Sequence, residues 1–362
     1  MCLVTVAHPL LTLETMNNKF PCALLVNDLH VSKDNIPEFQ KNWDEAVSIC
    51  KKLDIDYLIV GGDVWLSRSS QTLATLLAVR QAIINATNQG IYIIFGDGNH
   101  DKVDQELLES YNLIFSGYES VEVVSDHTVV DLSDDLSLFV MSYFPENGSF
   151  TQRLNELKSQ IEKGKKNVLY IHEGINGGLA IPSDDELPAS IFSEFDCTLV
   201  GHYHNRKKVA GTNIEYIGSS RQHNFGEDEE KGYTVLYSDG SYEFIKNEVN
   251  IRYRVIDIDL ADINEEFLQE LNRIKKDGRY RVKVRISCKS KEASTVDKQK
   301  LSECGATKIE LVTEKTEVAR HDPQSLSQKF DKKGIKQEYT NFCTNKGIAN
   351  VEMGLKYLDK IN

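Results

Sequence analysis

The sequence lacks the features that define several whole classes of protein. It contains no run of about 18 apolar residues, the length that a membrane-spanning helix needs, so we exclude an integral membrane protein. Its seven cysteines are odd in number, widely scattered and without a C-x-x-C pair, which argues against both a disulfide framework and a zinc ribbon. The first 20 residues have no basic stretch before their apolar run, so we predict no signal peptide there, and Met16 is an alternative start. Together these absences favour a cytoplasmic protein with reduced thiols.

Net positive charge is also missing. The chain has 42 Lys and Arg against 55 Asp and Glu, a net charge of −13, which taken alone argues against a nucleic-acid partner. The charge is unevenly spread, with −18 over residues 1–250 and +5 over residues 251–362. Two different tasks would explain this: carboxylates gathered around cations in the first part, and contact with a polyanion in the second. Compositional drift is the alternative.

Short apolar runs alternate with amphipathic segments over residues 21–250. The apolar runs are Cys22–Asn27, Tyr57–Val60, Ile91–Phe95, Asn167–Ile171 and Thr198–Val200. Apolar residues at helical spacing occupy Ile36–Leu53, Thr72–Ala86 and Gln152–Glu162. Buried strands alternating with helices predict a layered α/β (α+β) domain.

The pattern changes after residue 250. Residues 251–260 and 279–287 read as strands, residues 265–276 and 298–304 as helices, and residues 308–312 as a third strand. We therefore predict a small α+β domain over 251–320. Residues 321–362 contain no convincing strand, and the stretches 325–334 and 350–361 read as two short helices. Residues 1–20 form an N-terminal extension in this scheme.

Polar motifs follow the five apolar runs at the point where each run ends. They are Asp28-Leu29-His30, Gly62-Asp63, Gly98-Asn99-His100-Asp101, His172 and Gly201-His202-Tyr203-His204. One such motif has little specificity, because a lone core histidine is usually structural. Five in this order are very unlikely by chance, and ligand sites collect where the strands of such sheets end.

Asp, Asn and His side chains at these positions suit a pair of divalent cations. Two cations about 3.5–4 Å apart can clamp a phosphate and activate a bridging water. Asp63 is the natural bridging ligand, because a carboxylate can bind both ions. Asp28, His30 and His204 would complete one site, and Asn99, His172 and His202 the other. Nitrogen and oxygen ligands without thiolate favour Mn, Fe or Zn over Mg or Ca.

The ordered motifs D-x-H, G-D, G-N-H-D, H and G-H-x-H resemble those of the calcineurin-like metallophosphoesterase superfamily, over residues 22–235. The resemblance implies a four-layer α/β/β/α sandwich and the ligand assignment given above. It also implies that His100 acts near the phosphate as a general acid or transition-state stabiliser, oriented by Asp101. Leu66 is a departure, since many members carry a carboxylate or Asn there. The D-R-G of protein phosphatases is absent, which argues against a Ser/Thr phosphatase.

The segment after G-H-x-H carries a narrower resemblance. Tyr216–Arg221 (YIGSSR) and Gly226–Tyr233 (GEDEEKGY) are similar to the corresponding tract of SbcD-type DNA-repair nucleases and phage recombination endonuclease subunits. A solvated loop is the alternative for Glu227–Lys231. Arg221 and His223 lie in this tract, and we predict that they approach the substrate.

This resemblance implies the nuclease subunit of a DNA repair and recombination complex. The expected activities are manganese-dependent 3′–5′ exonuclease on duplex DNA and endonuclease on single strands. The expected partners are DNA, a second copy of the chain and an SbcC-type SMC-like ATPase bound by residues 321–362, with no membrane. A phage-encoded chain would act in the host cytoplasm.

One stretch of the small domain alternates cations with apolar residues. Arg279, Arg281, Lys283 and Arg285 would lie on one face of a strand, about 7 Å apart. That spacing is close to the spacing of phosphates along one DNA strand, so we predict a DNA-binding capping domain with sequence-independent, salt-sensitive contacts. An exposed strand face without a ligand is the alternative.

Two other functions stay open. A metallophosphoesterase acting on a nucleotide or a phosphoprotein would share the metal ligands but would not depend on DNA. A non-catalytic scaffold with a degenerate phosphoesterase fold would need eroded ligands, whereas every ligand position is filled here.

Overall fold

A computed structural model describes residues 19–146, 149–179, 186–313, 332–346, 348 and 351–358. It contains two compact units. The first comprises Met1–Ile256, Asn264–Val284 and Lys298–Ile309, and the second comprises Asp257–Ile263, Arg285–Asp297 and Glu310–Asn362. This division differs from the predicted domain boundaries at 250 and 320, which stay predictions. The predicted extension over 1–20 lies almost wholly outside the described residues.

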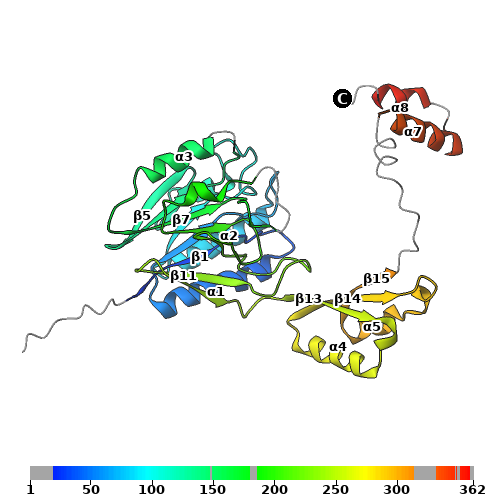
Figure 1. Cartoon of the computed structure of the whole chain (residues 1–362). Helices are drawn as coiled ribbons and strands as arrows, with labels where there is room; N and C mark the ends of the chain where they lie inside the picture. Colours follow the sequence, from blue (N-terminus) through cyan, green and yellow to red (C-terminus); the bar gives the residue numbers. More distant parts are fainter. Residues whose placement is uncertain are drawn as a thin grey trace, which may run out of the picture. The chain divides into compact units, whose positions relative to one another are not determined.

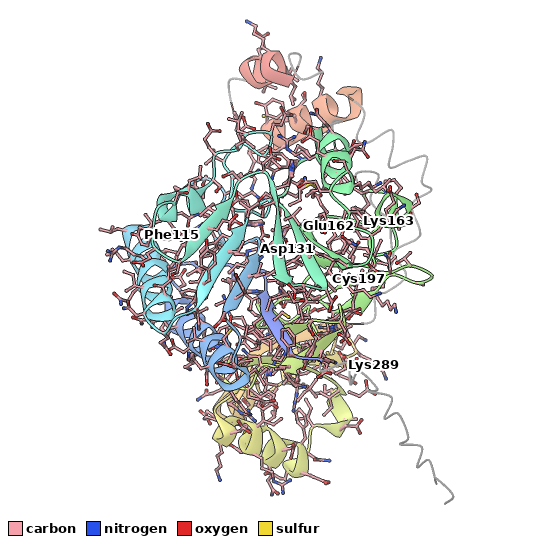
Figure 2. The ribbon with its side chains drawn as sticks, turned by 90° about the vertical axis from the view of Figure 1, so that its left-hand side faces the viewer. Phe115, Asp131, Glu162, Lys163, Cys197 and Lys289 are labelled. Carbon is pink, nitrogen blue, oxygen red and sulfur yellow. The ribbon has the colours of Figure 1, made fainter. Side chains whose placement is uncertain are left out.

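Two six-stranded sheets lie within residues 21–246 of the first unit (Figure 1). In spatial order, the first sheet is β12 (Tyr242–Lys246), β11 (Gly232–Tyr237), β1 (Pro21–Val26), β2 (Tyr57–Gly61), β3 (Tyr92–Gly96) and β4 (Val121–Val124). The second is β5 (His127–Ser133), β6 (Leu136–Met141), β7 (Lys166–His172), β8 (Cys197–Gly201), β10 (Ile214–Tyr216) and β9 (Lys207–Lys208). Asp131 of β5 and Cys197 of β8 mark the second sheet in Figure 2.

Helices cover the outer face of each sheet. Helix α1 (Ile36–Leu53) packs on β1 and β2, α2 (Leu73–Thr87) packs on β3 and α1, and α3 (Ser149–Lys158) packs on β5. The helix ends follow local chemistry. Pro37 stands in the first turn of α1, where its missing N–H costs no hydrogen bond, and the Thr72 hydroxyl caps α2 by accepting from the Thr75 N–H at 3.2 Å.

Three apolar layers hold these elements together. One lies between the first sheet and helices α1 and α2, around Trp43, Trp65 and Phe95. The second lies between the two sheets and contains alternate residues of their strands, such as Leu25 and Leu199. The third covers the outer face of the second sheet, where Phe150 and Leu154 of α3 pack. The predicted four-layer α/β/β/α sandwich is therefore confirmed.

Parallel pairing explains why the motifs meet. Strands β1, β2 and β3 are parallel neighbours, and so are β7 and β8, so the carboxyl ends within each group share one sheet edge. The Tyr170 hydroxyl of β7 donates to the Val26 carbonyl of β1 at 2.9 Å, which ties the two sheets next to Asp28. Two sheets joined here bring the five strand ends to one place.

The residues after 250 form a three-stranded sheet, β13 (Arg252–Asp259), β14 (Tyr280–Cys288) and β15 (Ala306–Thr313), with helices α4 (Glu265–Asp277) and α5 (Lys298–Cys304). Short 3₁₀ helices occur at Tyr111–Phe115, Ala189–Phe192, Leu260–Asp262 and Ala293–Thr295. The α+β prediction is accurate to within two residues at each end of these strands and helices. None of the helices that the structure describes is both long and apolar enough to span a lipid bilayer.

The C-terminal region differs from its prediction. Helix α7 covers Lys332–Lys346, whereas we predicted a helix over 325–334, most of which lies outside the described residues. Helix α8 covers Val351–Leu358, inside the second predicted segment of 350–361.

Candidate metal centre

Four of the predicted ligands have unusual backbone conformations. Asp28, His30, Asp63 and His202 have positive φ angles of 54°, 43°, 55° and 84°. Only Asp54 and Ser120 share this feature among the other non-glycine residues that the structure describes. The left-handed region costs a non-glycine residue on the order of 1–3 kcal/mol, and such strain collects at functional sites. The strand ends therefore turn sharply so that these side chains face one place.

Backbone hydrogen bonds and one buried carboxylate hold the strained loops. The Asp28 N–H donates to the Gly62 carbonyl at 3.0 Å, and the His30 N–H donates to the Asp63 carbonyl at 2.9 Å. Asp101 is fully buried, and its Oδ2 accepts from the N–H groups of Asp63 and Gly98 at 2.8 and 2.7 Å. Burial, followed by the nearby Asp63 charge, raises the pKa of Asp101 well above its usual value.

This position of Asp101 corrects one expectation. We predicted that Asp101 orients His100. Among the described residues, the group that accepts from the His100 ring is instead the Leu66 carbonyl, 2.7 Å from Nδ1. Asp101 shapes the loops that carry Asp63 and Asn99.

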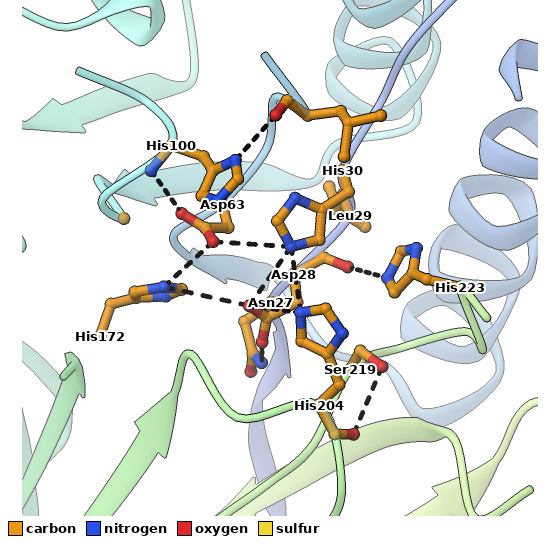
Figure 3. A network of polar contacts seen from close by, with 12 residues as sticks. Asn27, Asp28, Leu29, His30, Asp63, His100, His172, His204, Ser219 and His223 are labelled. Carbon is orange, nitrogen blue, oxygen red and sulfur yellow. Dashed lines mark hydrogen bonds and ion pairs between the residues drawn. The ribbon is translucent and has the colours of Figure 1, made fainter. Parts of the chain in front are cut away.

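Five side-chain atoms converge at the centre of the site (Figure 3). His30 Nε2 lies 3.5 Å from Asp63 Oδ2 and 3.1 Å from His204 Nε2. His172 Nε2 lies 3.3 Å from Asp63 Oδ2 and 3.9 Å from Asp28 Oδ1, and His204 Nε2 lies 3.7 Å from Asp28 Oδ1. Ligands that bind one ion at about 2.1 Å are themselves about 3–3.5 Å apart, so these separations fit shared cations.

The tautomers of two histidines support the same conclusion. His172 Nδ1 lies 2.9 Å from the Gly61 carbonyl, and His204 Nδ1 lies 2.8 Å from Glu227 Oε1. Both partners are acceptors, so each Nδ1 carries a hydrogen, and in the neutral ring each Nε2 then turns a lone pair toward a carboxylate, where a cation could bind it. Buried His172 Nε2 and Asp28 Oδ1 make no hydrogen bond within the described chain. A cation between them satisfies both atoms, so the residues fit a metal centre.

Without a cation, a proton on His172 occupies the space between this ring and Asp63. Burial lowers the pKa of His172, but the Asp63 charge more than offsets it and raises the pKa to about 10. Burial lowers the pKa of His30 to about 4. The pKa of His202 also falls to about 4, through burial and the neighbouring His172.

Asn99 and His202 are less directly placed for metal. The Asn99 amide lies between Asp63 and Arg68. Without a cation, the hydrogen bonds of this amide are satisfied when its nitrogen lies 3.3 Å from Asp63 Oδ1 and its oxygen accepts from the Arg68 guanidinium. In the opposite orientation the oxygen faces Asp63 and could bind a cation there. The His202 ring packs against His172, with 5.3 Å between ring centroids, and belongs to none of the candidate ligand groups found among the described residues. The second site is therefore less complete than the first.

His100 stands at the edge of the same cluster. Its backbone N–H donates to Asp63 Oδ1 at 2.8 Å, and its ring lies 4.8 Å from that of His30. Since Nδ1 carries the hydrogen that goes to Leu66, Nε2 can donate only when the ring is protonated. His30, Asp63 and His100 also form a candidate ligand group.

Arg221, expected near the substrate, faces the loops instead, whereas the His223 ring lies 5.1 and 5.0 Å from the rings of His30 and His204, so its approach to the substrate stays a prediction. Arg221 is buried and donates to the Leu29 carbonyl at 2.8 Å. His223 is half-buried, with Nε2 2.8 Å from the Asp28 carbonyl. Both side chains therefore support the backbone of the first motif.

A solvated loop is the alternative for Glu227–Lys231, but part of this tract lies inside the protein. The Lys231 side chain is fully buried, and its Nζ donates to the His204 carbonyl at 2.6 Å. Glu227 was not among the predicted site residues. Its position after G-H-x-H was the available signal, but the sequence could not show that its side chain turns inward.

The basic strand has the predicted alternation. Val282, Val284 and Ile286 are buried, while Arg281 is exposed and Lys283 and Arg285 are half-buried. Arg285 pairs with Asp257 at 2.6 Å, and Arg279 pairs with Asp277 at 3.0 Å. The four basic positions have no acidic residue between them, but Asp257 and Asp277, from outside the strand, neutralise two of them.

The layered sandwich and the converging donors define a metal-dependent phosphoesterase. Residues 23–206 match the family described as calcineurin-like phosphoesterase. This match covers half of the chain, which therefore belongs to that family.

The chain also resembles several curated proteins, at identities of 23–26%. The chain is 26% identical over 254 residues to the D subunit of the nuclease SbcCD from Staphylococcus epidermidis, an alignment that covers 60% of this chain and 66% of the relative, just under two thirds of its length. It is 23% identical to the putative phosphoesterase 078R of Invertebrate iridescent virus 3, covering 85% and 89%. It is 25% identical to the DNA double-strand break repair protein Mre11 of Methanocaldococcus jannaschii, covering 73% and 72%. A dimetal phosphatase structure from Danio rerio has a TM-score of 0.40 at 10% identity, covering 60% and 93%.

Proposed function

We propose that this protein is the nuclease subunit of a DNA repair and recombination complex and hydrolyses DNA phosphodiester bonds with two divalent cations. One observation supports metal-dependent phosphodiester hydrolysis above all. Two buried atoms able to bind a metal, Asp28 Oδ1 and His172 Nε2, face each other and make no hydrogen bond within the described chain. DNA as substrate is supported by the names of two relatives, the D subunit of the nuclease SbcCD and Mre11.

The chain's own residues have distinct tasks in this proposal. Asp63 would help to hold both cations, since its Oδ2 lies 3.5 Å from His30 Nε2 and 3.3 Å from His172 Nε2. Asp28 and His204 complete one position, and Asn99 belongs to the other once its amide has turned. Bound cations supply charge stabilisation at the phosphate and a water of lowered pKa. His100, in its protonated form, donates from Nε2 to the leaving group or a phosphate oxygen.

The finer proposal is manganese-supported 3′–5′ exonuclease activity on duplex DNA and endonuclease activity on single strands. A homodimer and an SbcC-type ATPase partner belong to it, as does a cytoplasmic location. Domain limits of 21–250 for the nuclease, 251–320 for the cap and 321–362 for the partner-binding helices complete it.

The decisive experiment is digestion of end-labelled duplex DNA with manganese by the wild type and by Asp63→Ala. The wild type should cleave, EDTA should stop it, and the variant should lose at least about a thousandfold in rate because a ligand of both cations is gone. No cleavage by a folded, manganese-loaded wild type would refute the proposal.

A second candidate is a phosphoesterase acting on nucleotides or phosphoproteins; the viral relative, with 89% of its length covered, is named a putative phosphoesterase and not a nuclease. It predicts hydrolysis of bis-p-nitrophenyl phosphate or p-nitrophenyl phosphate without any DNA cleavage. Parallel assays with these substrates and with DNA separate the two.

A further inference from the structure

Glu227 makes a contact with the centre that the proposed function does not use. Its side chain is only 7% exposed, and Oε1 lies 2.8 Å from His204 Nδ1. The other oxygen, Oε2, accepts from the His223 N–H at 3.0 Å. The Asn224 amide donates to Oε1 at 2.7 Å. These three contacts fix the carboxylate in one orientation.

A buried lysine completes the arrangement. Lys231 Nζ lies 3.8 Å from Glu227 Oε2 and donates to the His204 carbonyl and to Asn205 Oδ1, at 2.6 and 2.8 Å. Glu227 thus holds the ring of His204 and Lys231 holds its backbone. A buried charge costs free energy unless it is paired, and each of these two charges is near the other.

We propose that Glu227 is a positioning residue for His204. By accepting from Nδ1–H, it keeps the Nε2 lone pair toward Asp28 Oδ1, 3.7 Å away, and increases the basicity of the ring. Such partners of ligating histidines commonly change metal affinity by about 10–100-fold when removed. This inference rests on the proposed two-metal centre but on no particular substrate.

Calorimetric titration of the metal-free full chain with manganese tests it. The wild type should bind two ions. Glu227→Ala should lose about 10–100-fold in affinity at one site and keep the other, while Glu227→Gln, which keeps a neutral acceptor, should lose less. Glu230→Gln is the matched control, because Glu230 is exposed on the same tract and pairs with Lys246 at 2.6 Å.

Three outcomes would overturn the inference. These are equal affinities in all four proteins, an equal loss at both sites, and a wild type that binds no manganese; the last would overturn the two-metal centre as well. If Glu227→Ala does not fold, NMR of the ring nitrogens in Glu227→Gln still decides. A His204 ring that keeps Nδ1–H as firmly as in the wild type, with unchanged manganese affinity, contradicts the positioning role.

A separate observation concerns Arg68. Its side chain is exposed and has no acidic partner within the described part of the chain. The loop that carries it is held in place, because the Leu66 carbonyl binds the His100 ring and the Tyr111 hydroxyl donates to the Arg68 carbonyl at 3.1 Å. The backbone of this segment is thus held in place, and the Arg68 guanidinium lies beside Asn99.

We infer that Arg68 binds a phosphate oxygen of the substrate. This inference rests on the proposed function. The Asn99 oxygen cannot serve Arg68 and a cation together, and the cation repels the guanidinium. Metal loading therefore releases Arg68 toward an anion, and guanidinium groups bind phosphate through two parallel hydrogen bonds.

Kinetics on labelled DNA, with manganese affinity measured alongside, test this role. Arg68→Ala should raise KM about 10–100-fold with unchanged manganese affinity, Arg68→Lys should recover part of the loss, and Arg80→Ala should match the wild type. Arg80 is an exposed arginine on α2 that donates to Tyr118. An unchanged KM, or a KM effect that follows a loss of manganese, overturns the inference. A wild type that leaves DNA intact refutes the proposed function itself.

Discussion

His100 can be separated experimentally from the ligands around it. Because Leu66 takes the Nδ1 hydrogen, the remaining nitrogen is available for proton transfer or hydrogen bonding at the phosphate. We predict that His100→Asn lowers kcat about 10²–10⁴-fold while manganese binding and DNA binding persist. Rapid-quench kinetics and metal titration would check this. A variant that loses a metal ion instead would make His100 a ligand.

Gly98 occupies a position that admits no side chain. A Cβ there would meet the backbone nitrogen and the carboxylate of Asp63, whereas a Cβ at Gly96 would make only ordinary contacts, with a Val140 methyl at 3.4 Å and the Val60 carbonyl oxygen at 3.7 Å. We predict that Gly98→Ala displaces Asp63 and abolishes manganese binding, and that Gly96→Ala leaves it unchanged. Metal titration and thermal melting of both variants decide, and manganese binding retained by Gly98→Ala would contradict the geometry.

Single residues mark the limit of what the sequence predicts. Asp28, His30, Asp63, His172 and His204 could be selected in advance, since their types and strand-end positions identify them. The left-handed backbone at Asp28 could not, because the sequence does not show how sharply the chain turns. Arg221 was misplaced because a charged residue in a motif suggests a substrate, whereas this one donates to the backbone at Leu29.

At the scale of elements, the first turn of α1 is hydrogen-bonded to the segment that follows β12. Glu38 Oε2 accepts from the Asn250 amide at 2.9 Å and from the Ile251 N–H at 3.0 Å. Burial raises the pKa of Glu38, but these hydrogen bonds more than offset it, so the pKa lies below its usual value.

A carboxyl whose pKa is lower in the folded protein than in the unfolded chain stabilises the fold when the pH is above its unfolded-state pKa, about 4.3 for Glu. This stabilisation is lost as the pH falls through the pKa of the folded protein. We predict that Glu38→Gln costs about 1–3 kcal/mol at pH 7 and progressively less below pH 4.3. Urea unfolding across this range measures it, with Asp44→Asn, exposed on the same helix, as control. A cost independent of pH would exclude the ionised hydrogen bonds as its cause.

Helices α1 to α5 and the parallel strands β1, β2, β3, β7 and β8 were predictable from the sequence. The helix over Ile36–Leu53 matches α1, because its apolar spacing is regular and Pro37 marks its start. Seven strands of the two sheets were not predicted: β4, β5, β6, β9, β10, β11 and β12. Four of them lie at sheet edges, where partial exposure weakens the apolar signal, and β11 pairs antiparallel with β1 across more than 200 residues of sequence. Non-local pairing of this kind leaves no local pattern.

At the scale of the whole molecule, the basic strand tests the DNA proposal. Arg281 is exposed, unlike Arg285, which pairs with Asp257. If Arg281 contacts one phosphate, Arg281→Ala should reduce the slope of log K against log salt by about 0.9 and weaken binding equally for all sequences. Fluorescence anisotropy at several salt concentrations measures the slope. Lys52→Ala, on α1, is the control, and equal slopes would remove Arg281 from the interface.

The division of the ligands between two sheets has a consequence for stability. Asp28 and Asp63 follow strands of the first sheet, while His172 ends a strand of the second sheet and His204 follows another. Ions that bind both groups cross-link the halves of the sandwich and should add about 2.7 kcal/mol per site when free metal is 100 times the dissociation constant. Chelation should then speed amide hydrogen exchange in β1 and β7 more than in α2. In cells with little manganese, proteases would consequently degrade the metal-free protein faster than the metal-bound protein.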